Sequence, residues 1–176
     1  MRFPRETHWQ GKPFIGTPAN GGFTSAEVKG TGERYLHHAV HIRTDGTVGL
    51  ANSGERIDGF FVMFDGDTNP MLIYRDSSKG SYARNGGTAP ITPDSRLVGA
   101  EKTNATLIAK YPQCGYVQAV DTTPGGTGIS DIKAAIDRAL YGVNNICRKG
   151  GSGSAADVYP PADVVVEHGI ATDAGN

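Results

Sequence analysis

The feature that most constrains this fold is a pair of closely spaced turn signals in residues 42–61, IRTDGTVGLANSGERIDGFF. Asp45-Gly46 can supply the positive φ angle that a tight β-hairpin needs, and Asn52-Ser53-Gly54 predicts a second turn. Only short strands fit between turns so close together. Glycine (25) and proline (10) make up roughly a fifth of the 176 residues, against a usual share near ~12%. The excess predicts many turns and short elements along the whole chain.

Short apolar segments separated by turn signals predict a mainly β (α+β) fold, with a small β-barrel or sandwich as the body. The alternation in residues 35–42 places Leu36 and Val40 on one face of a strand and His37 and His41 on the other. We expect strands at residues 35–42, 47–50, 57–64, 71–74, 96–100, 105–109 and 116–120.

One principal helix is expected at about residues 130–141. Ser130 can cap it, and Gly142 can end it. Its helical periodicity comes from an apolar stripe made by Ile132, Ile136, Ala139 and Leu140.

The chain divides by composition into an extended N-terminal arm (1–24), a β-rich body (25–146) and a glycine- and serine-rich linker with a C-terminal tail (147–176). Pro4, Pro13 and Pro18 oppose both helix and interior strand in the arm. The tail is expected to contain a short strand that needs a sheet edge, its own or a neighbour's. The predicted partner-binding residues are the aromatic anchors and the tail valines: Phe3, Trp9, Phe14, Phe23, Val164, Val165 and Val166. The alternative for the arm is that it folds back over its own core.

Composition excludes several classes of function. A formal net charge of −1 gives no electrostatic attraction to nucleic acid, so no nucleic-acid partner is expected. No apolar run is long enough for a signal peptide or a membrane span, so we expect synthesis in the cytoplasm and no membrane partner. Cys114 and Cys147 have no metal-type spacing and are expected to be free thiols.

Two candidate ligand sites are weak. The loop 124–128 lies between a predicted strand and a predicted helix, as phosphate loops do, but it lacks their glycine spacing. Asp121 and Asp131 also place negative charge where an anion would bind. His37 and His41 could share a face as zinc ligands, yet no cysteine or carboxylate is tied to them by local spacing.

Two further candidates are also weak. The pattern Asp65-x-Asp67-x-Asn69 begins like a calcium loop, but Pro70 stands where that loop needs glycine. Cys114 and His168 could be drawn as a thiol dyad, as any chain with five histidines allows. We therefore expect no catalytic residue, no metal and no cofactor.

Residues 33–121 resemble the small decoration, or cement, proteins of tailed-bacteriophage capsids. The resemblance lies in the order of a strand, an Asp-Gly hairpin and an "I-x-G" corner with an apolar strand, here Ile57-Asp58-Gly59. An "I-x-P-x-S-R-L" or "I-x-x-G-x-R-L" segment follows, here residues 91–97, and then an apolar strand in residues 114–120, CGYVQAV. The chain departs from the pattern at Asp94-Ser95, where glycine is usual, and in its arm, helix and tail.

The resemblance implies a structural virion protein that binds the outside of a phage capsid and cements neighbouring major capsid subunits. Its partners would be the major capsid protein and copies of itself, as a homo-oligomer for which a trimer is one option. The alternative is a carbohydrate- or receptor-binding module of a virion or cell surface, for which Tyr74, Tyr82 and Tyr111 are the candidate exposed aromatics. A small-barrel enzyme is not favoured, because the sequence contains no convergent polar cluster.

Overall fold

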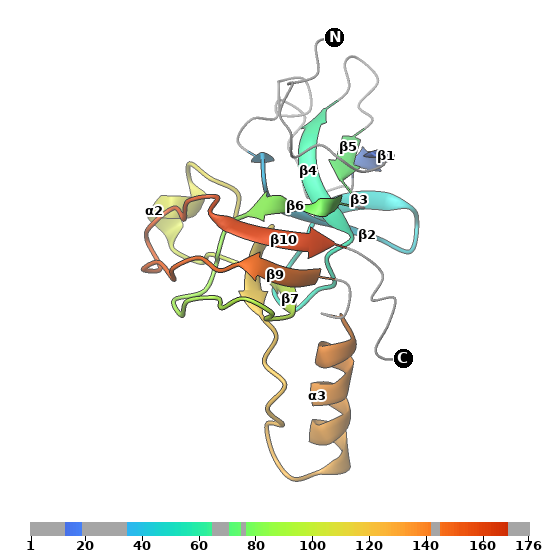
Figure 1. Cartoon of the computed structure of the whole chain (residues 1–176), viewed down its shortest axis with the longest axis vertical. Coiled ribbons are helices and arrows are strands. Elements are labelled where there is room, and N and C mark those ends of the chain that lie inside the picture. Colours follow the sequence, from blue (N-terminus) through green and yellow to red (C-terminus); the bar gives the residue numbers. More distant parts are fainter. Residues whose placement is uncertain (1–12, 19–34, 65–70, 75–76, 142–144, 169–176) are drawn as a thin grey trace.

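The computed structural model describes residues 13–18, 35–64, 71–74, 77–141 and 145–168 (Figure 1). This part of the chain is mainly β, which confirms the predicted class. Its elements in chain order are β1 (Pro13–Pro18), β2 (Ala39–Ile42), β3 (Thr47–Leu50), β4 (Gly59–Phe64), β5 (Met71–Tyr74), β6 (Ser77–Ala83), β7 (Leu97–Ala100), α2 (Ala105–Ile108), β8 (Tyr116–Ala119), α3 (Ile129–Tyr141), β9 (Asn145–Lys149) and β10 (Val164–His168).

The first sheet contains five strands in the order β1-β3-β2-β4-β5. β2 pairs antiparallel with both β3 and β4, and β4 pairs antiparallel with β5. β1 then pairs antiparallel with β5 and parallel with β3, so the hydrogen-bonded order returns to its first strand.

The predicted hairpin joins β2 to β3. The Gly46 N–H donates to Arg43 O, and Gly46 has a φ of +82°, so the hydrogen-bonded turn 43–46 ends in a left-handed glycine. Asp45 Oδ1 accepts from both the backbone N–H and the hydroxyl of Thr47, at 2.9 and 2.7 Å. The second predicted turn is also present, with Gly54 at a φ of +77°.

The other two sheets form the second half of the body. β10 lies between β6 and β9, antiparallel to both, and β7 pairs antiparallel with β8 (Figure 1). The buried residues of this half include Ile57, Leu97, Val117, Val164 and Val166. A second core lies inside the first sheet and contains Tyr35, Val40, Val48, Leu50 and Phe61.

Two predicted strands are wrong in part or whole. Residues 105–109 were expected to be extended, but Ala105–Ile108 is helix α2, because the Asn104 side chain accepts from the N–H groups of Thr106 and Leu107 and caps a helical turn. The strand expected at 35–42 begins only at Ala39, since His37 has a φ of +68° and the His38 N–H donates to Tyr35 O in a turn.

The N-terminal arm was expected to contain no regular element, but its residues 13–18 form strand β1. Pro13 and Pro18 are the first and last residues of this strand, where a missing N–H disturbs the ladder least.

The segment expected to be a linker is a packed part of the body. A Cβ atom at Gly150 would lie 2.0 Å from Ile91 O, and one at Gly153 would lie 1.9 Å from Thr88 O. The buried Lys102 donates its ammonium hydrogens to the Ser154 hydroxyl and to the carbonyl oxygen of Ala155, at 3.0 and 3.1 Å. Glycine is used here for close backbone approach to the loop 85–95 rather than for flexibility.

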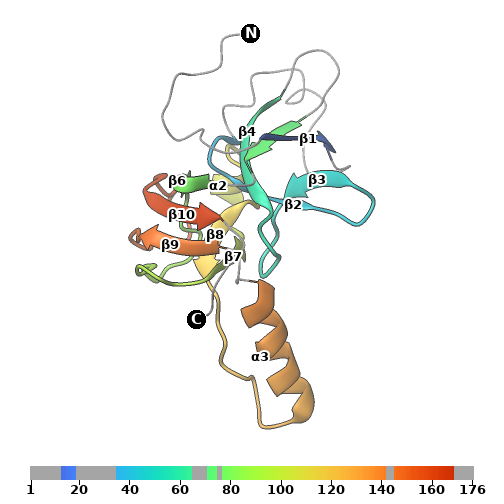
Figure 2. The ribbon, with the colours of Figure 1, turned by 45° about the vertical axis from the view of Figure 1, so that its right-hand side comes forward.

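Helix α3 begins at Ile129 and ends at Tyr141, close to the predicted bounds. Both ribbon views show it outside the body, joined to β8 by an extended segment that runs alongside it (Figures 1 and 2). This projection is the most prominent feature of the described molecule.

Candidate partner-binding surface

The structure bears unequally on the residues predicted to bind a partner. Phe3, Trp9 and Phe23 lie outside the described residues, and Phe14 lies in β1, where its backbone is opposite Ile73 of β5. Their role therefore stays a prediction.

The tail valines lie in a strand, as predicted, but the strand belongs to the chain's own sheet. Val164 and Val166 are completely buried, and Val165 is half-buried. Because β10 has a neighbour on each side, it offers no free edge to another chain. The structure corrects the prediction for these residues: they stabilise the core.

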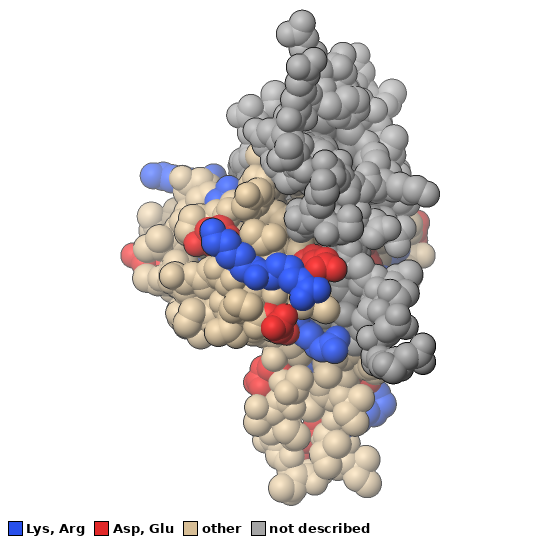
Figure 3. Space-filling model, viewed as in Figure 1, with Lys and Arg blue, Asp and Glu red and all other residues tan. Residues whose placement is uncertain are grey.

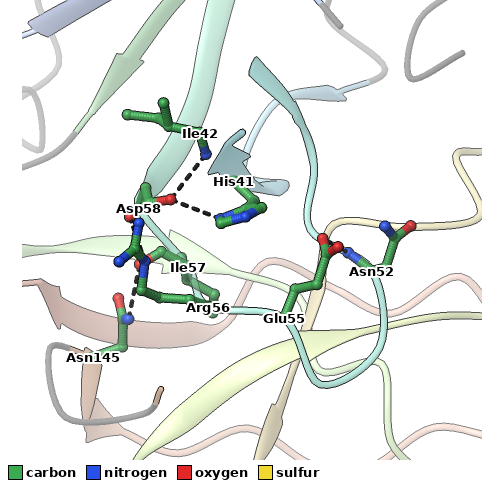
Figure 4. Close-up of polar contacts among 8 residues, drawn as sticks. All are labelled: His41, Ile42, Asn52, Glu55, Arg56, Ile57, Asp58 and Asn145. Carbon is green, nitrogen blue, oxygen red and sulfur yellow. Dashed lines mark hydrogen bonds and ion pairs between the residues drawn. The ribbon is translucent and has the colours of Figure 1, made fainter. Parts of the chain in front are cut away.

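A polar cluster surrounds Asp58 at the corner that leads into β4 (Figure 4). Its Oδ2 accepts from His41 Nδ1 and from the backbone N–H of Ile42, both at 2.8 Å. Its Oδ1 accepts from Arg56 Nε at 2.9 Å. The side chain of Asp58 is only 9% exposed, so these contacts satisfy a nearly buried carboxylate.

The residues next to Asp58 are also held by hydrogen bonds. The Asp58 N–H donates to Val40 O, and Asn145 Nδ2 donates to Ile57 O at 3.1 Å (Figure 4). In the preceding turn, Glu55 Oε2 accepts from the Asn52 N–H at 2.9 Å. The "I-x-G" corner thus joins β2, β4 and β9. Its carboxylate (Asp58) and the His41 imidazole are bonded to each other and hold β2 to the corner.

An aromatic cluster that sequence reasoning missed surrounds Tyr159. Its ring stacks on Tyr111 at a centroid distance of 3.9 Å, and the Arg84 guanidinium lies 4.5 Å from its centroid. The Tyr159 hydroxyl lies 3.1 Å from Nε2 of the buried His38. These contacts fix the segment after Gly153 against the body. They also occupy a ring face of Tyr111, which the carbohydrate-module alternative needs exposed.

Of the other two tyrosines in that alternative, Tyr82 is 40% exposed, and its ring and the His37 ring lie in a T-shaped arrangement. Tyr74 contributes its backbone to β5.

The candidate metal and thiol sites gain no support from the geometry. His41 is bonded to Asp58, and the described residues contain no group of three or more metal-type ligands. Burial, with Glu101 and Glu55 nearby, raises the pKa of the Cys114 thiol to about 11, and this thiol donates to Asn52 Oδ1 at 3.2 Å. A raised pKa makes a poor nucleophile. The calcium-like residues 65–69 lie outside the described part.

The loop 124–128 is exposed and is followed directly by α3. Asp131 Oδ2 accepts from the Gly128 N–H at 3.3 Å, so a carboxylate of the chain already occupies the position that an anion would need. Helix α3 starts one residue before the predicted cap Ser130, because this acidic side chain turns back onto the first turn.

The exposed apolar stripe of α3 is the surface most suited to a partner. Ile129, Ile132, Ile136 and Leu140 are 88, 45, 54 and 62% exposed. Figure 3 shows few charged side chains on the visible face of this projection, whereas both signs are interspersed over the body. Large apolar side chains that gather on one exposed face mark interaction sites in soluble proteins.

The helix is held by its opposite side. Ala135 is buried, and Arg138 donates to Asp121 O at 2.7 Å and to Thr123 O at 2.8 Å. The contact between α3 and the segment that precedes it (residues 120–128) therefore uses a different face of the helix from the stripe. Sequence periodicity located the stripe, but it carried no signal that the stripe would be exposed.

Neither described helix is long and apolar enough to cross a bilayer. Comparisons with protein-family models, with curated proteins and with solved structures found no significant match.

Proposed function

We propose that this chain is a structural virion protein that binds the outside of a phage capsid and cements neighbouring major capsid subunits. In this proposal it is made in the host cytoplasm, acts on the capsid surface, is not an enzyme and needs no cofactor. Its partners are the major capsid protein and further copies of itself.

The observation that carries the proposal is the backbone of Asp94. The pattern of the cement proteins has glycine at this place in the segment 91–97, and Asp94 has a φ of +67°, a left-handed conformation that favours glycine. The flanking Ile91 and Leu97 are buried, as the pattern's apolar positions require. The residue that departs from the pattern therefore keeps the backbone conformation that the pattern implies.

The "I-x-G" corner gives a second, independent point of agreement. Ile57 is fully buried, Asp58 is bonded to three donors, and Gly59 begins β4. We propose that the body is a small β-barrel, and the return of β1 to β3 and β5 supports this. A cement protein needs such a rigid body to hold its partner-binding segments at fixed positions.

Two parts of the chain are proposed to make the contacts. The arm residues Phe3, Trp9, Phe14 and Phe23 would bind the capsid as aromatic anchors, since a few such residues carry most of an interface's energy. The stripe on α3 adds a second apolar surface, on the helix that projects from the body in Figure 1.

The test is co-sedimentation of the purified chain with mature, undecorated capsids of tailed phages. We expect saturable binding with a fixed number of copies for each capsid and a higher melting temperature of the capsid. Trp9→Ala should weaken binding, because burying a large side chain contributes on the order of 1.5–3 kcal/mol. Val158→Asp is the control, since Val158 is 47% exposed and is not one of the proposed contact residues.

The carbohydrate- or receptor-binding alternative makes the opposite prediction. If the chain binds none of the capsids tested but binds a glycan array, and if Tyr82→Ala loses the glycan binding, the proposed cementing function is wrong and the chain is a carbohydrate-binding module.

A further inference from the structure

We propose that the apolar stripe of α3 is the contact through which this chain binds a second copy of itself, with the two helices packed antiparallel. This deepens the self-association part of the proposed function by naming its surface and its geometry.

Part of the apolar face of α3 has a self-complementary spacing. Ile129, Ile132, Ile136 and Ala139 follow one another at intervals of three, four and three residues, so their order of intervals is the same in either direction, whereas the exposed Leu140 lies outside this symmetric set. This is the spacing by which two helices pack side chains into each other's grooves. An antiparallel pair centred on residue 134 places Ile132 against Ile136 twice and Ile129 against the small Ala139.

The charges beside the stripe favour the same orientation. Lys133 and Asp137 lie on one flank and are paired within the helix at 2.6 Å, with side chains 73 and 42% exposed. In an antiparallel pair centred on residue 134, Asp137 of the second copy lies at the level of residue 131 of the first copy and on the same flank as Lys133. Lys133 and this second Asp137 are therefore two residues apart along the helix axis, or about 3 Å. Each lysine can thus contact the Asp137 of its own helix and the Asp137 of the second copy.

A parallel pair offers no such match. In a parallel pair, the two-fold axis places the Lys133 side of one helix next to the Ala135 side of the other. Lys133 then has no acidic side chain of the second copy beside it. Ala135 is also buried within the chain itself, so this side of the helix is not free to receive a second copy.

A second copy fits this surface better than an unrelated protein does. An unrelated partner needs no symmetry in the helix, whereas a two-fold contact is reciprocal: if Ile132 contacts Ile136 of the second copy, Ile136 contacts Ile132 of the second copy. The helix has 13 residues and is about 20 Å long, so two such helices bury less than the ~1,200 Å² of a stable interface. We therefore expect weak pairing in solution. The pairing becomes stronger where two copies are already held close together on one surface, because their effective concentration is then higher.

The first test is sedimentation equilibrium of the full chain up to about 1 mM. We expect a monomer–dimer equilibrium, weakened at least tenfold by Ile136→Asp. Because Ile136 is exposed, this variant should keep the circular dichroism and melting temperature of the wild type. Val158→Asp introduces the same charge at a similarly exposed apolar residue and should leave the dimer unchanged. A chain that stays monomeric throughout, or a dimer that Ile136→Asp does not weaken, overturns the proposal.

The second test measures orientation with a short bismaleimide. A mixture of Ile132→Cys and Ile136→Cys chains should give mainly the mixed 132–136 product. A parallel pair instead gives each variant linked to itself, and that result overturns the antiparallel geometry. The wild type is the control for Cys114 and Cys147, which are half-buried and buried.

Capsid binding is scored separately. If Ile136→Asp abolishes capsid binding while leaving the oligomeric state unchanged, the stripe binds a capsid subunit and the proposal is wrong. If the wild-type chain pairs through α3 yet ignores capsids, the cementing function fails and the pairing surface stands.

Discussion

Substituting Gly153 by alanine tests whether the glycine- and serine-rich segment after β9 is packed, as the structure shows, or is a flexible linker. A Cβ atom at this position would lie 1.9 Å from Thr88 O and 2.8 Å from the carbonyl carbon of Ala89. Both neighbours are backbone atoms, so they cannot rotate away as a side chain could. The segment and the loop 85–95 must separate by about 1 Å to admit a methyl group.

The expected cost has two parts. Forcing an extra methyl group into a packed site costs about 1–3 kcal/mol. The same displacement breaks the adjacent hydrogen bond from the Ser154 N–H to Gly87 O, 3.2 Å long, which contributes about 0.5–1.5 kcal/mol. We therefore expect Gly153→Ala to lower the free energy of unfolding by about 2–4 kcal/mol. For a chain of this size, that lowers Tm by roughly 4–16 °C.

The measurement is urea unfolding followed by circular dichroism, with thermal unfolding as a second observable. Gly125→Ala is the matched control, because Gly125 is exposed and a Cβ there meets nothing within 4 Å. In a flexible segment, replacing glycine by alanine stabilises by about 0.4–1 kcal/mol, because it restricts the unfolded chain. The two ideas thus predict opposite signs, and a neutral or stabilised Gly153→Ala protein refutes the packing argument.

Three further predictions concern single side chains. Asp58→Ala should lower the free energy of unfolding by about 2–4 kcal/mol in urea, because it leaves the Ile42 N–H without its acceptor, and a loss below 0.5 kcal/mol contradicts the joining role of the "I-x-G" corner. Asp94→Ala should cost about 1 kcal/mol more than Asp94→Gly in the same assay, because only glycine adopts the left-handed conformation without strain; equal stabilities would mean that the backbone relaxes. Iodoacetamide should label Cys114 at a rate that rises up to about pH 11 in the folded protein but levels off near pH 9 in urea. Since the folded pKa is raised, this thiol's contribution to stability is present below pH 9 and decreases towards pH 11, and Cys114→Ala should lack that decrease.

The elements that could be predicted from the sequence are those decided by near neighbours. Gly46 and Gly54 stand where the chain needs a positive φ, and both turns are present. The helical period of α3 extends over three turns and located its bounds to within one residue. Strand β5 was predicted with its observed bounds, Met71–Tyr74, because turn residues precede it.

Other elements could not be predicted because their local pattern fits two structures or because the deciding contact is distant in sequence. Residues 105–109 are short and apolar, a pattern that fits a strand or a helical turn, and the cap from Asn104 decides between them. The role of Gly153 depends on a carbonyl at residue 88, which no local pattern indicates. The same holds for the candidate site. Helical periodicity predicted the apolar stripe of α3, but its exposure depends on the position of the helix outside the body, which no local pattern indicates.

The place of β10 in its sheet has a consequence for how the chain is made. A ribosome adds residues 164–168 after every other described strand, yet Val164 lies opposite Ala83 of β6, and Val166 lies opposite Cys147 of β9. Until β10 emerges, β6 and β9 have no common neighbour, and the core around Leu97 lacks two of its valines. Pairing across so long a stretch of chain is slow. Nascent chains of this protein therefore expose an unpaired edge of β6 and an unpaired edge of β9 until residues 164–168 have emerged, and the sheet that joins these strands forms only after that point.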